Sequence, residues 1–418
     1  MTDQQVLEHL KAVKEASRQL VKLDRKLVRD IIHEVAEEAA NQQSKILAAN
    51  KKDLAKMSKK DPMYDRLLLD PNRLSHIFYD MASVAEMRSP LNLTLEDRVA
   101  ASGLYMQRVS VPLGVVGIVY EARPNVTFDV FALCFKSGNA AVLKGGKAAK
   151  GTNLAIFEII QSVLARHHLA NAIYLMPGDR KFIPTLLTAT DMVDVIIPRG
   201  SSKLIQFVRT NSTVPVIETG AGIVHTYFDE TADAKIGRAI IVNAKTRRVS
   251  VCNALDTLIL HQSRLKNLPG LVKGLDKKYR LEIFADKAAM EVLQGKYEGK
   301  LLSPAKASHY GNEFLSMKMS IKTVDSFDAA LDHIYRYGSR HSEAIISQDD
   351  EAIQRFFREV DAAAIYSNAS TAFTDGGEFG LGAEIGISTQ KLHARGPMGL
   401  RALTSSKWVI EGAGQTRP

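Results

Sequence analysis

Cys252 is the residue whose surroundings best suit nucleophilic chemistry. It follows the run Asn-Ala-Lys-Thr-Arg-Arg-Val-Ser-Val (243–251) and precedes a strand-like segment, so it lies where a loop meets a strand. Lys245, Arg247 and Arg248 bring positive charge near it, and such charge favours a thiolate and attracts anions. The pattern fits a nucleophile and also fits a buried loop cysteine, and the residues alone leave both interpretations open.

The second cysteine, Cys134, has an apolar neighbourhood. It lies in Asp-Val-Phe-Ala-Leu-Cys-Phe, where Val130, Phe131 and Leu133 occupy adjoining faces of a predicted helix. A small core residue is the simplest interpretation. With two cysteines and no CxxC pair, we expect reduced thiols and a cytoplasmic location.

The standard nucleotide and metal motifs are missing from the sequence. The run GGKAAK (145–150) has Ala148 where a Walker A loop needs Ser or Thr, and GLGAEIG (380–386) lacks the GxGxxG spacing. The eleven histidines include no i, i+4 pair, no Cys–His spacing suits zinc, and there is no GxSxG. We therefore expect neither a bound metal nor a serine hydrolase.

A weaker signal lies in the segment 194–202, Asp-Val-Ile-Ile-Pro-Arg-Gly-Ser-Ser. It predicts a buried strand, a glycine turn and a helix capped by Ser201 or Ser202. Free N–H groups and the positive end of the helix would then point at an anion. An ordinary strand-to-helix turn would give the same pattern.

Composition indicates a globular chain of two or three domains. Its 418 residues are 45% hydrophobic and 24% charged, which excludes disorder, coiled coil and a disulfide scaffold. The net charge of +9 comes from scattered residues, and with one Trp and no recognition motif we expect anion pockets and no nucleic-acid partner. The apolar runs are shorter than the ~20 residues that span a bilayer, and the amphipathic N-terminus has no export signal, so we expect no membrane association.

Periodicity predicts helices in the first hundred residues, then alternating strands and helices. Such alternation is typical of parallel sheets covered by helices on both faces. The predicted strands are Val115–Tyr120, Ala140–Lys144, Ala172–Met176, Val193–Pro198 and Val214–Glu218; the helices are Val126–Lys136, Ala149–Arg166, Lys181–Ala189 and Ser202–Thr210. A second block has a helix to Asn243, a strand at Leu255–His261 and further units to Ile365, before a Gly-rich tail.

Several long runs together resemble a known family. They are PLGVVGIVYEARPNVT (112–127), KSGNAAVLKGGK (136–147), VCNA (251–254), GLGAEIGIST (380–389) and KLHARGPMGL (391–400). They are similar to the γ-glutamyl phosphate reductases, also called glutamate-5-semialdehyde dehydrogenases, a branch of the aldehyde dehydrogenase superfamily. The resemblance covers nearly the whole chain and implies an α/β fold with two parallel-sheet domains and a small β oligomerisation extension.

The resemblance also implies the reaction. L-glutamate 5-phosphate and NADPH would give L-glutamate 5-semialdehyde, phosphate and NADP+, the second step of proline biosynthesis from glutamate. Cys252 would attack the acyl phosphate and form a thioester, which accepts hydride more readily than a carboxylate does. Asn125 matches the superfamily asparagine that, with the N–H of Cys252, stabilises the oxyanion.

Cofactor residues follow from the same resemblance. Lys144 matches the lysine that reaches the adenosine ribose, and Lys147 stands where NAD-dependent members often carry a glutamate. A cation there suits the 2′-phosphate of NADPH. Arg199-Gly200-Ser201 matches the turn beside the pyrophosphate, and Glu313 aligns with the glutamate on the nicotinamide ribose, although an exposed loop carboxylate is its alternative.

Substrate contacts are expected from Arg247, Arg248 and Arg395, with His225 and His393 as further donors. One stretch departs from the superfamily: hydrolytic aldehyde dehydrogenases carry Glu-Leu-Gly-Gly, whose glutamate activates water, and here the sequence is Glu218-Thr-Gly-Ala-Gly. Because a reductase must not hydrolyse its thioester, we interpret Glu218 as structural.

The expected domains are an NADPH-binding domain (1–228), a catalytic cysteine domain (229–366) and a return segment (367–418). The resemblance further implies that a hairpin at 98–111 and a strand at Ser405–Ile410 join subunits into a homo-oligomer. A separate glutamate 5-kinase would be a transient partner. The alternatives are a hydrolytic aldehyde or semialdehyde dehydrogenase, and a non-catalytic protein that binds nucleic acid through its basic surface.

Overall fold

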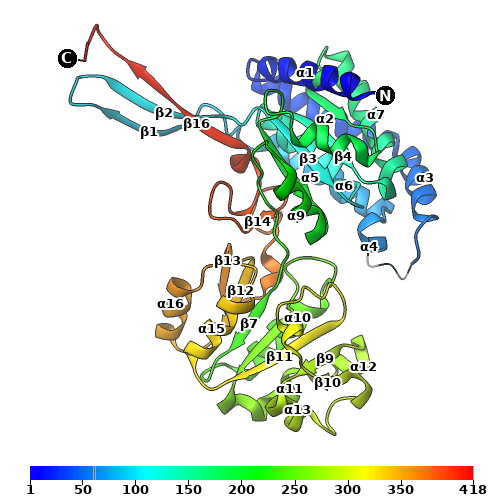
Figure 1. Ribbon diagram of the computed structural model, residues 1–418, viewed down its shortest axis with the longest axis vertical. Coiled ribbons are helices and arrows are strands. Elements are labelled where there is room, and N and C mark those ends of the chain that lie inside the picture. Colours follow the sequence, from blue (N-terminus) through cyan, green and yellow to red (C-terminus); the bar gives the residue numbers. More distant parts are fainter. Residues whose placement is uncertain (60, 62, 418) are drawn as a thin grey trace. The chain divides into compact units, whose positions relative to one another are not determined.

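Two compact units make up the computed structural model, which describes residues 1–59, 61 and 63–417 (Figure 1). Unit 1 comprises Met1–Thr219, Gly380–Gly386 and Leu392–Pro418, and unit 2 comprises Gly220–Phe379 and Ile387–Lys391. Within the described residues, no helix has the length and apolar character needed to cross a membrane. The domain ranges from the sequence, with their cofactor-binding and catalytic roles, stay predictions.

Helices open unit 1, as the apolar spacing predicts. Each longer helix turns valine, leucine and isoleucine inward and charged residues outward. The side chains of Thr2 and Gln5 form a capping box at the first helix, and Asp70 caps the fifth just before Pro71. The bounds are α1 (Asp3–Leu20), α2 (Arg25–Asn41), α3 (Gln43–Leu54), α4 (Met63–Leu67) and α5 (Pro71–Glu86).

A four-stranded parallel sheet with the order β5-β4-β3-β6 forms the centre of unit 1. Its strands are β3 (Val115–Tyr120), β4 (Ala140–Gly145), β5 (Ile173–Leu175) and β6 (Val195–Arg199), and the helices between and after them are α6 (Asn125–Lys136), α7 (Lys150–Arg166), α8 (Ile183–Leu187) and α9 (Ser202–Asn211). These elements confirm the predicted alternation. The strand predicted at Val214–Glu218 is wrong: only Val216 forms a bridge, to Ile196, because Pro215 has no N–H to extend the ladder.

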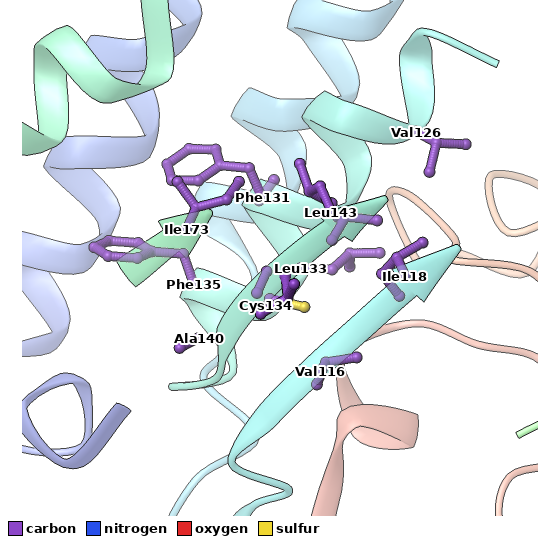
Figure 2. Packing of buried hydrophobic residues seen from close by; sticks show 14 of the residues in the cluster. Val116, Ile118, Val126, Phe131, Leu133, Cys134, Phe135, Ala140, Leu143 and Ile173 are labelled. Carbon is purple, nitrogen blue, oxygen red and sulfur yellow. The ribbon is translucent and has the colours of Figure 1, made fainter. Parts of the chain in front are cut away.

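The core of unit 1 forms where α6 packs on β3 and β4. Figure 2 shows Cys134 on α6 beside Leu133, facing Val116 on β3 and Leu143 on β4. Cys134 is 1% exposed. The prediction of a small core cysteine is confirmed.

An antiparallel three-stranded sheet, with the order β1-β2-β16, extends from the body of unit 1 (Figure 1). Its strands are β1 (Thr94–Val99), β2 (Tyr105–Pro112) and β16 (Thr404–Glu411). The predicted hairpin around Gly103 and the predicted C-terminal strand are both present, although β1 begins within the first hundred residues, for which the apolar spacing predicted helices.

Unit 2 is built on a parallel seven-stranded sheet with the order β10-β9-β11-β8-β7-β12-β13. Its strands are β7 (His225–Phe228), β8 (Thr257–His261), β9 (Glu282–Ala285), β10 (Leu302–Pro304), β11 (Lys318–Val324), β12 (Ser342–Ile346) and β13 (Ala364–Ser367). Its helices are α10 (Ala234–Thr246), α11 (Leu268–Leu271), α12 (Leu275–Tyr279), α13 (Lys287–Leu293), α14 (Ala307–Tyr310), α15 (Phe327–Tyr337) and α16 (Asp350–Glu359). The short strands β14 (Ile387–Ser388) and β15 (Gly396–Pro397) lie in the tail.

The amino ends of the strands of unit 2 share one edge of the sheet. Gly222 precedes β7, Cys252 precedes β8, Glu313 precedes β11 and His341 precedes β12. In a parallel sheet these preceding segments meet at the same edge, although they are far apart in the sequence. This edge therefore positions the candidate nucleophile.

Candidate active site

Cys252 lies in the turns that connect α10 to β8, and its side chain is half-buried. The backbone of Gly222, before β7, packs directly on it: a Cβ on Gly222 would lie 1.6 Å from the carbonyl oxygen of Cys252. Only glycine permits this approach. Gly222, the last residue of the Glu218-Thr-Gly-Ala-Gly stretch, thus has a steric function: it lets the two backbone segments approach each other beside Cys252.

His341 provides a contact that the sequence analysis missed. Its Nε2 lies 3.1 Å from Sγ of Cys252, and its side chain is completely buried at the start of β12. The signal was available: a histidine immediately before one buried strand and a cysteine in the segment that leads into another lie at the same edge of a parallel sheet. The sequence does not show which strands are neighbours, so the contact between His341 and Cys252 could not be predicted from it.

The residue after the nucleophile fixes the loop. Asn253 is buried, and its Nδ2 donates to the carbonyl oxygens of Thr374, at 2.9 Å, and Ala372, at 3.3 Å. In return, Oγ1 of Thr371 donates to the carbonyl oxygen of Asn253 at 2.9 Å. These bonds tie the Cys252 loop to the short 3₁₀ helix Thr371–Phe373.

Glu313 lies close to the same loop. Its Oε1 accepts a hydrogen bond of 3.1 Å from the N–H of Gly222, the residue packed on Cys252. The carboxylate is therefore fixed to the segment that packs on the backbone of Cys252, and is not exposed on a distant loop. Its predicted role on a nicotinamide ribose stays a prediction.

Lys245 is an interior residue and not a surface cation. Its side chain is fully buried at the end of α10, and burial lowers its pKa to about 8 despite the opposing charge of Asp256. Burial likewise raises the pKa of Asp256 to about 7, while Lys245 and the N–H of Phe314, which donates at 3.0 Å, act in the other direction. Lys245 and Asp256 flank the segment that carries Cys252 and interact electrostatically.

The three predicted substrate arginines are exposed. Arg247 and Arg248 follow α10 in the cysteine loop of unit 2, whereas Arg395 lies in the tail of unit 1. The first two therefore share a loop with the nucleophile. All three roles stay predictions.

The two histidines expected as further donors differ in exposure. His225 is completely buried on β7, with Nδ1 3.0 Å from Oε2 of Glu343, which leaves it no surface to offer a substrate. His393 is exposed, and its Nε2 lies 2.8 Å from the carbonyl oxygen of Ala402.

Asn125 begins α6 in unit 1, directly after Pro124. Its Nδ2 donates to Oδ2 of Asp129, one turn along the helix, at 2.9 Å. Burial raises the pKa of Asp129 to about 7, against the lowering effect of this hydrogen bond. The aspartate orients the amide on which the predicted oxyanion role depends.

The other predicted cofactor residues lie at the carboxyl ends of β4 and β6. Lys144 is buried, and burial lowers its pKa to about 8; its Nζ donates to the carbonyl oxygen of Gly178 at 3.3 Å. Lys147 is exposed just beyond β4. Nη2 of Arg199 lies 3.9 Å from Oε1 of Glu384 in the Gly-rich tail segment of unit 1.

Gly200 and Ser201 form the turn before α9. Ser201 is the helix cap, as the sequence predicts, and both its N–H and its Oγ donate to Oε2 of Glu121 at 3.1 Å. A Cβ on Gly200 would lie 2.7 Å from that carboxylate oxygen. The turn therefore accommodates an anionic oxygen, the chemistry that a pyrophosphate requires.

Glu218 lies 3.6 Å from Arg209, measured from Oε2 to Nη1. The structural role inferred for Glu218 from the sequence stays a prediction. We assign it no part in the chemistry.

Comparison with known proteins places this geometry in a family. No family model matches the chain. It is 56% identical to the γ-glutamyl phosphate reductase of Pelodictyon phaeoclathratiforme, over 99% of both chains. It superposes on the crystal structure of γ-glutamyl phosphate reductase from Thermotoga maritima with a TM-score of 0.92 and 37% identity, covering 99% of both chains.

More distant structures share the fold alone. An acetylating aldehyde dehydrogenase from Geobacillus thermoglucosidasius is 16% identical, with a TM-score of 0.72 over 100% of this chain and 98% of that one. The predicted fold class and the predicted resemblance are both confirmed. At 56% identity over nearly the full length of both sequences, the chain belongs to the γ-glutamyl phosphate reductase family.

Proposed function

We propose that this enzyme reduces L-glutamate 5-phosphate to L-glutamate 5-semialdehyde and phosphate with NADPH, the second step of proline biosynthesis from glutamate. The observation that carries the proposal is a half-buried cysteine, Cys252, at the amino edge of a parallel sheet, in a chain 56% identical to a γ-glutamyl phosphate reductase. An acyl phosphate is already activated, so a thiolate can displace phosphate without further activation of the substrate.

The thiolate of Cys252 attacks the carbonyl carbon, a C–S bond forms, and the C–O bond to phosphate breaks with its electron pair. The amide of Asn125 and the N–H of Cys252 are the proposed donors to the oxyanion. Asp129 supports this role, because it accepts a hydrogen bond from Nδ2 of Asn125 and so orients the amide. After reduction of the thioester, the oxyanion expels the thiolate and the semialdehyde leaves.

A nicotinamide cofactor supplies the hydride when it is bound. The turn at Gly200 and Ser201 suits its pyrophosphate, because this turn already accommodates a carboxylate oxygen. Lys144 and Glu313 would hold the two riboses, and Arg199 would support the pyrophosphate turn. We propose NADPH rather than NADH because Lys147 is exposed just beyond β4, and the family resemblance aligns it with the glutamate of NAD-dependent members, where a cation would suit a 2′-phosphate.

Glu218 bears on the hydrolytic alternative. A water-activating carboxylate would turn this enzyme into an oxidative, hydrolysing aldehyde dehydrogenase, but Glu218 is paired with Arg209. We therefore propose that the thioester is protected from hydrolysis. Arg247 and Arg248, beside the nucleophile, and Arg395 are the proposed partners of the substrate phosphate and carboxylate.

We also propose a homo-oligomer. The sheet β1-β2-β16 leaves both its outer strands without a neighbour in this sheet, and Val99, Trp408 and Ile410 are exposed on them. A cytoplasmic location is consistent with Cys134 and Cys252, which form no disulfide among the described residues. Glutamate 5-kinase is the proposed transient partner, because its product cyclises readily.

The test is reduction of NADP+ by L-glutamate 5-semialdehyde, with and without phosphate. We expect activity only when phosphate or arsenate accepts the acyl group. Activity without phosphate would assign the enzyme to the hydrolytic dehydrogenases and return Glu218 to the site. Arg247→Ala should raise the KM for the substrate, and an unchanged KM would remove Arg247.

A further inference from the structure

A line of side chains leads away from the sulfur of Cys252 into the interior of unit 2. His341 Nε2 lies 3.1 Å from Sγ, and His341 Nδ1 lies 2.8 Å from Oγ of Ser342. Oγ of Ser342 lies 2.8 Å from Oγ1 of Thr374, which lies 2.8 Å from the hydroxyl of Tyr366. The line joins the starts of β8 and β12 to the strand β13.

These groups are held in place by their surroundings. His341, Ser342 and Thr374 are completely buried, and Thr374 follows the 3₁₀ helix that Asn253 ties to the cysteine loop. The same segment thus anchors both the nucleophile and the far side of the histidine. A ring fixed at both nitrogens keeps one orientation toward the sulfur.

We propose that His341 is a catalytic base that takes the proton from the thiol of Cys252, and that Ser342 and Thr374 are positioning residues for its ring. This inference deepens the proposed function, since it adds a group to the same reaction.

The proton balance is simple. The S–H bond breaks, Nε2 of His341 gains the proton, and the sulfur lone pair attacks the acyl carbon as the bond to phosphate breaks. The departing phosphate takes its own proton from solvent. When the thiohemiacetal expels the thiolate, the imidazolium returns its proton to sulfur, so the enzyme is regenerated unchanged.

The hydrogen bonds of His341 are compatible with both the neutral and the protonated imidazole. If Nδ1–H donates to Oγ of Ser342, Nε2 carries a lone pair for the thiol proton. After the transfer both nitrogens carry hydrogen, and Nε2–H donates to the thiolate. The serine and threonine hydroxyls accept and donate in turn, so the line remains bonded throughout.

Charged groups from the surrounding elements define the electrostatics of the pair. On β12, the buried carboxylate of Glu343 acts electrostatically on His341, although its nearest hydrogen-bond partner is His225. Arg340 precedes His341 in the sequence, and its Nε lies 3.8 Å from Oδ2 of Asp361. The charged residues near Cys252 in the sequence are the buried Lys245 and Asp256 and the exposed Arg247 and Arg248. At the other end of the line, Tyr366 on β13 is the last group.

The rate of alkylation of Cys252 by iodoacetamide, measured from pH 6 to pH 10 in the cofactor-free enzyme, tests the proposal. Because only thiolate reacts, we expect wild type to react at pH 7 about tenfold or more faster than His341→Gln, with the two rates converging above about pH 9.5. His76→Gln, an exposed histidine on α5, is the matched control and should behave as wild type. Cys252→Ser should take up no label.

Two results would overturn the proposal. In the first, wild type and His341→Gln are alkylated at equal rates at pH 7. In the second, His341→Gln is alkylated more slowly than wild type by the same factor at every pH. If His341→Gln does not fold, the wild-type profile decides, since an inflection at or above pH 8.5, the usual pKa of a free thiol, excludes a base at Nε2. Alkylation does not depend on the substrate, so failure here is distinct from failure of the proposed reaction.

The positioning residues have a smaller expected effect. Thr374→Val removes the hydroxyl and keeps the shape, and we expect it to slow alkylation at pH 7 about two- to tenfold. Thr374→Ser restores a hydroxyl and should restore the rate. A Thr374→Ser variant as slow as Thr374→Val would mean that packing, and not the hydrogen bond, supports His341.

Discussion

The two cysteines of this protein have opposite surroundings. Cys134 packs among aliphatic side chains on α6, and burial raises its pKa far above the usual value (Figure 2). Cys252 lies half-buried at a sheet edge, with an imidazole nitrogen 3.1 Å from its sulfur. The same side chain is inert in one region and a proposed nucleophile in the other, which shows that the environment, and not the residue type, decides the chemistry.

Removing each sulfur gives the sharpest test of this contrast. We expect Cys252→Ala to lower phosphate-dependent reduction of NADP+ by about 10⁴-fold or more, because no other group can form the thioester. Cys134→Ala should keep kcat and KM within about twofold. Comparable losses in the two variants would break the comparison.

The helix that carries Cys134 also presents Asn125 in its first turn. Asn125→Ala should lower kcat about 100- to 1,000-fold through loss of one oxyanion donor. Because the core contacts of α6 lie further along the helix, thermal unfolding should change little. A large fall in the melting temperature with unchanged kcat would instead make Asn125 structural.

The close approach of Gly222 to the cysteine loop predicts a steric effect. In Gly222→Ala the new Cβ must displace the Cys252 backbone, and we expect kcat to fall about 100-fold. Gly270→Ala in α11 is the control, because a Cβ there meets nothing within 4 Å. Wild-type kinetics in Gly222→Ala would show that the loop tolerates the shift.

Asp129 makes the region around α6 sensitive to pH. Its pKa is raised to about 7 in the folded protein, against about 4 when unfolded, so its contribution to stability is complete below about pH 4 and is lost as the pH rises through 7. Between pH 5 and pH 8, wild type should lose about 1–3 kcal/mol of unfolding free energy relative to Asp129→Asn. Denaturant titrations that shift in parallel for both proteins would contradict this.

The smallest expected effect is the packing contribution of the inert thiol. Cys134→Ala should cost about 1 kcal/mol of unfolding free energy, from lost contacts and a small cavity. Chemical denaturation measures it. A neutral result would mean that the core around α6 relaxes to fill the space.

The fold class could be predicted from the sequence because the parallel strands are continuous apolar runs, as in β3, β4 and β8. Local motifs also predicted the Ser201 cap, which is confirmed, and indicated Cys252 as a nucleophile, whereas Asn125 was predicted only through the family resemblance. Sequence reasoning placed a strand over Val214–Glu218, where proline limits pairing to a single bridge. It missed His341 because the partner of a side chain at a sheet edge depends on strand order, which no local pattern records.

Segments of the tail, Gly380–Gly386 and the residues from Leu392 onward, belong to unit 1, and this determines the order in which the two units can finish folding. The carbonyl oxygen of Leu403 accepts hydrogen bonds from the N–H of Leu113 and from Asn139, and β16 pairs along β2. On the ribosome, therefore, the seven-stranded sheet of unit 2 has all its strands once β13 emerges, whereas the antiparallel sheet of unit 1 also needs β16. The half that is synthesised first is finished last.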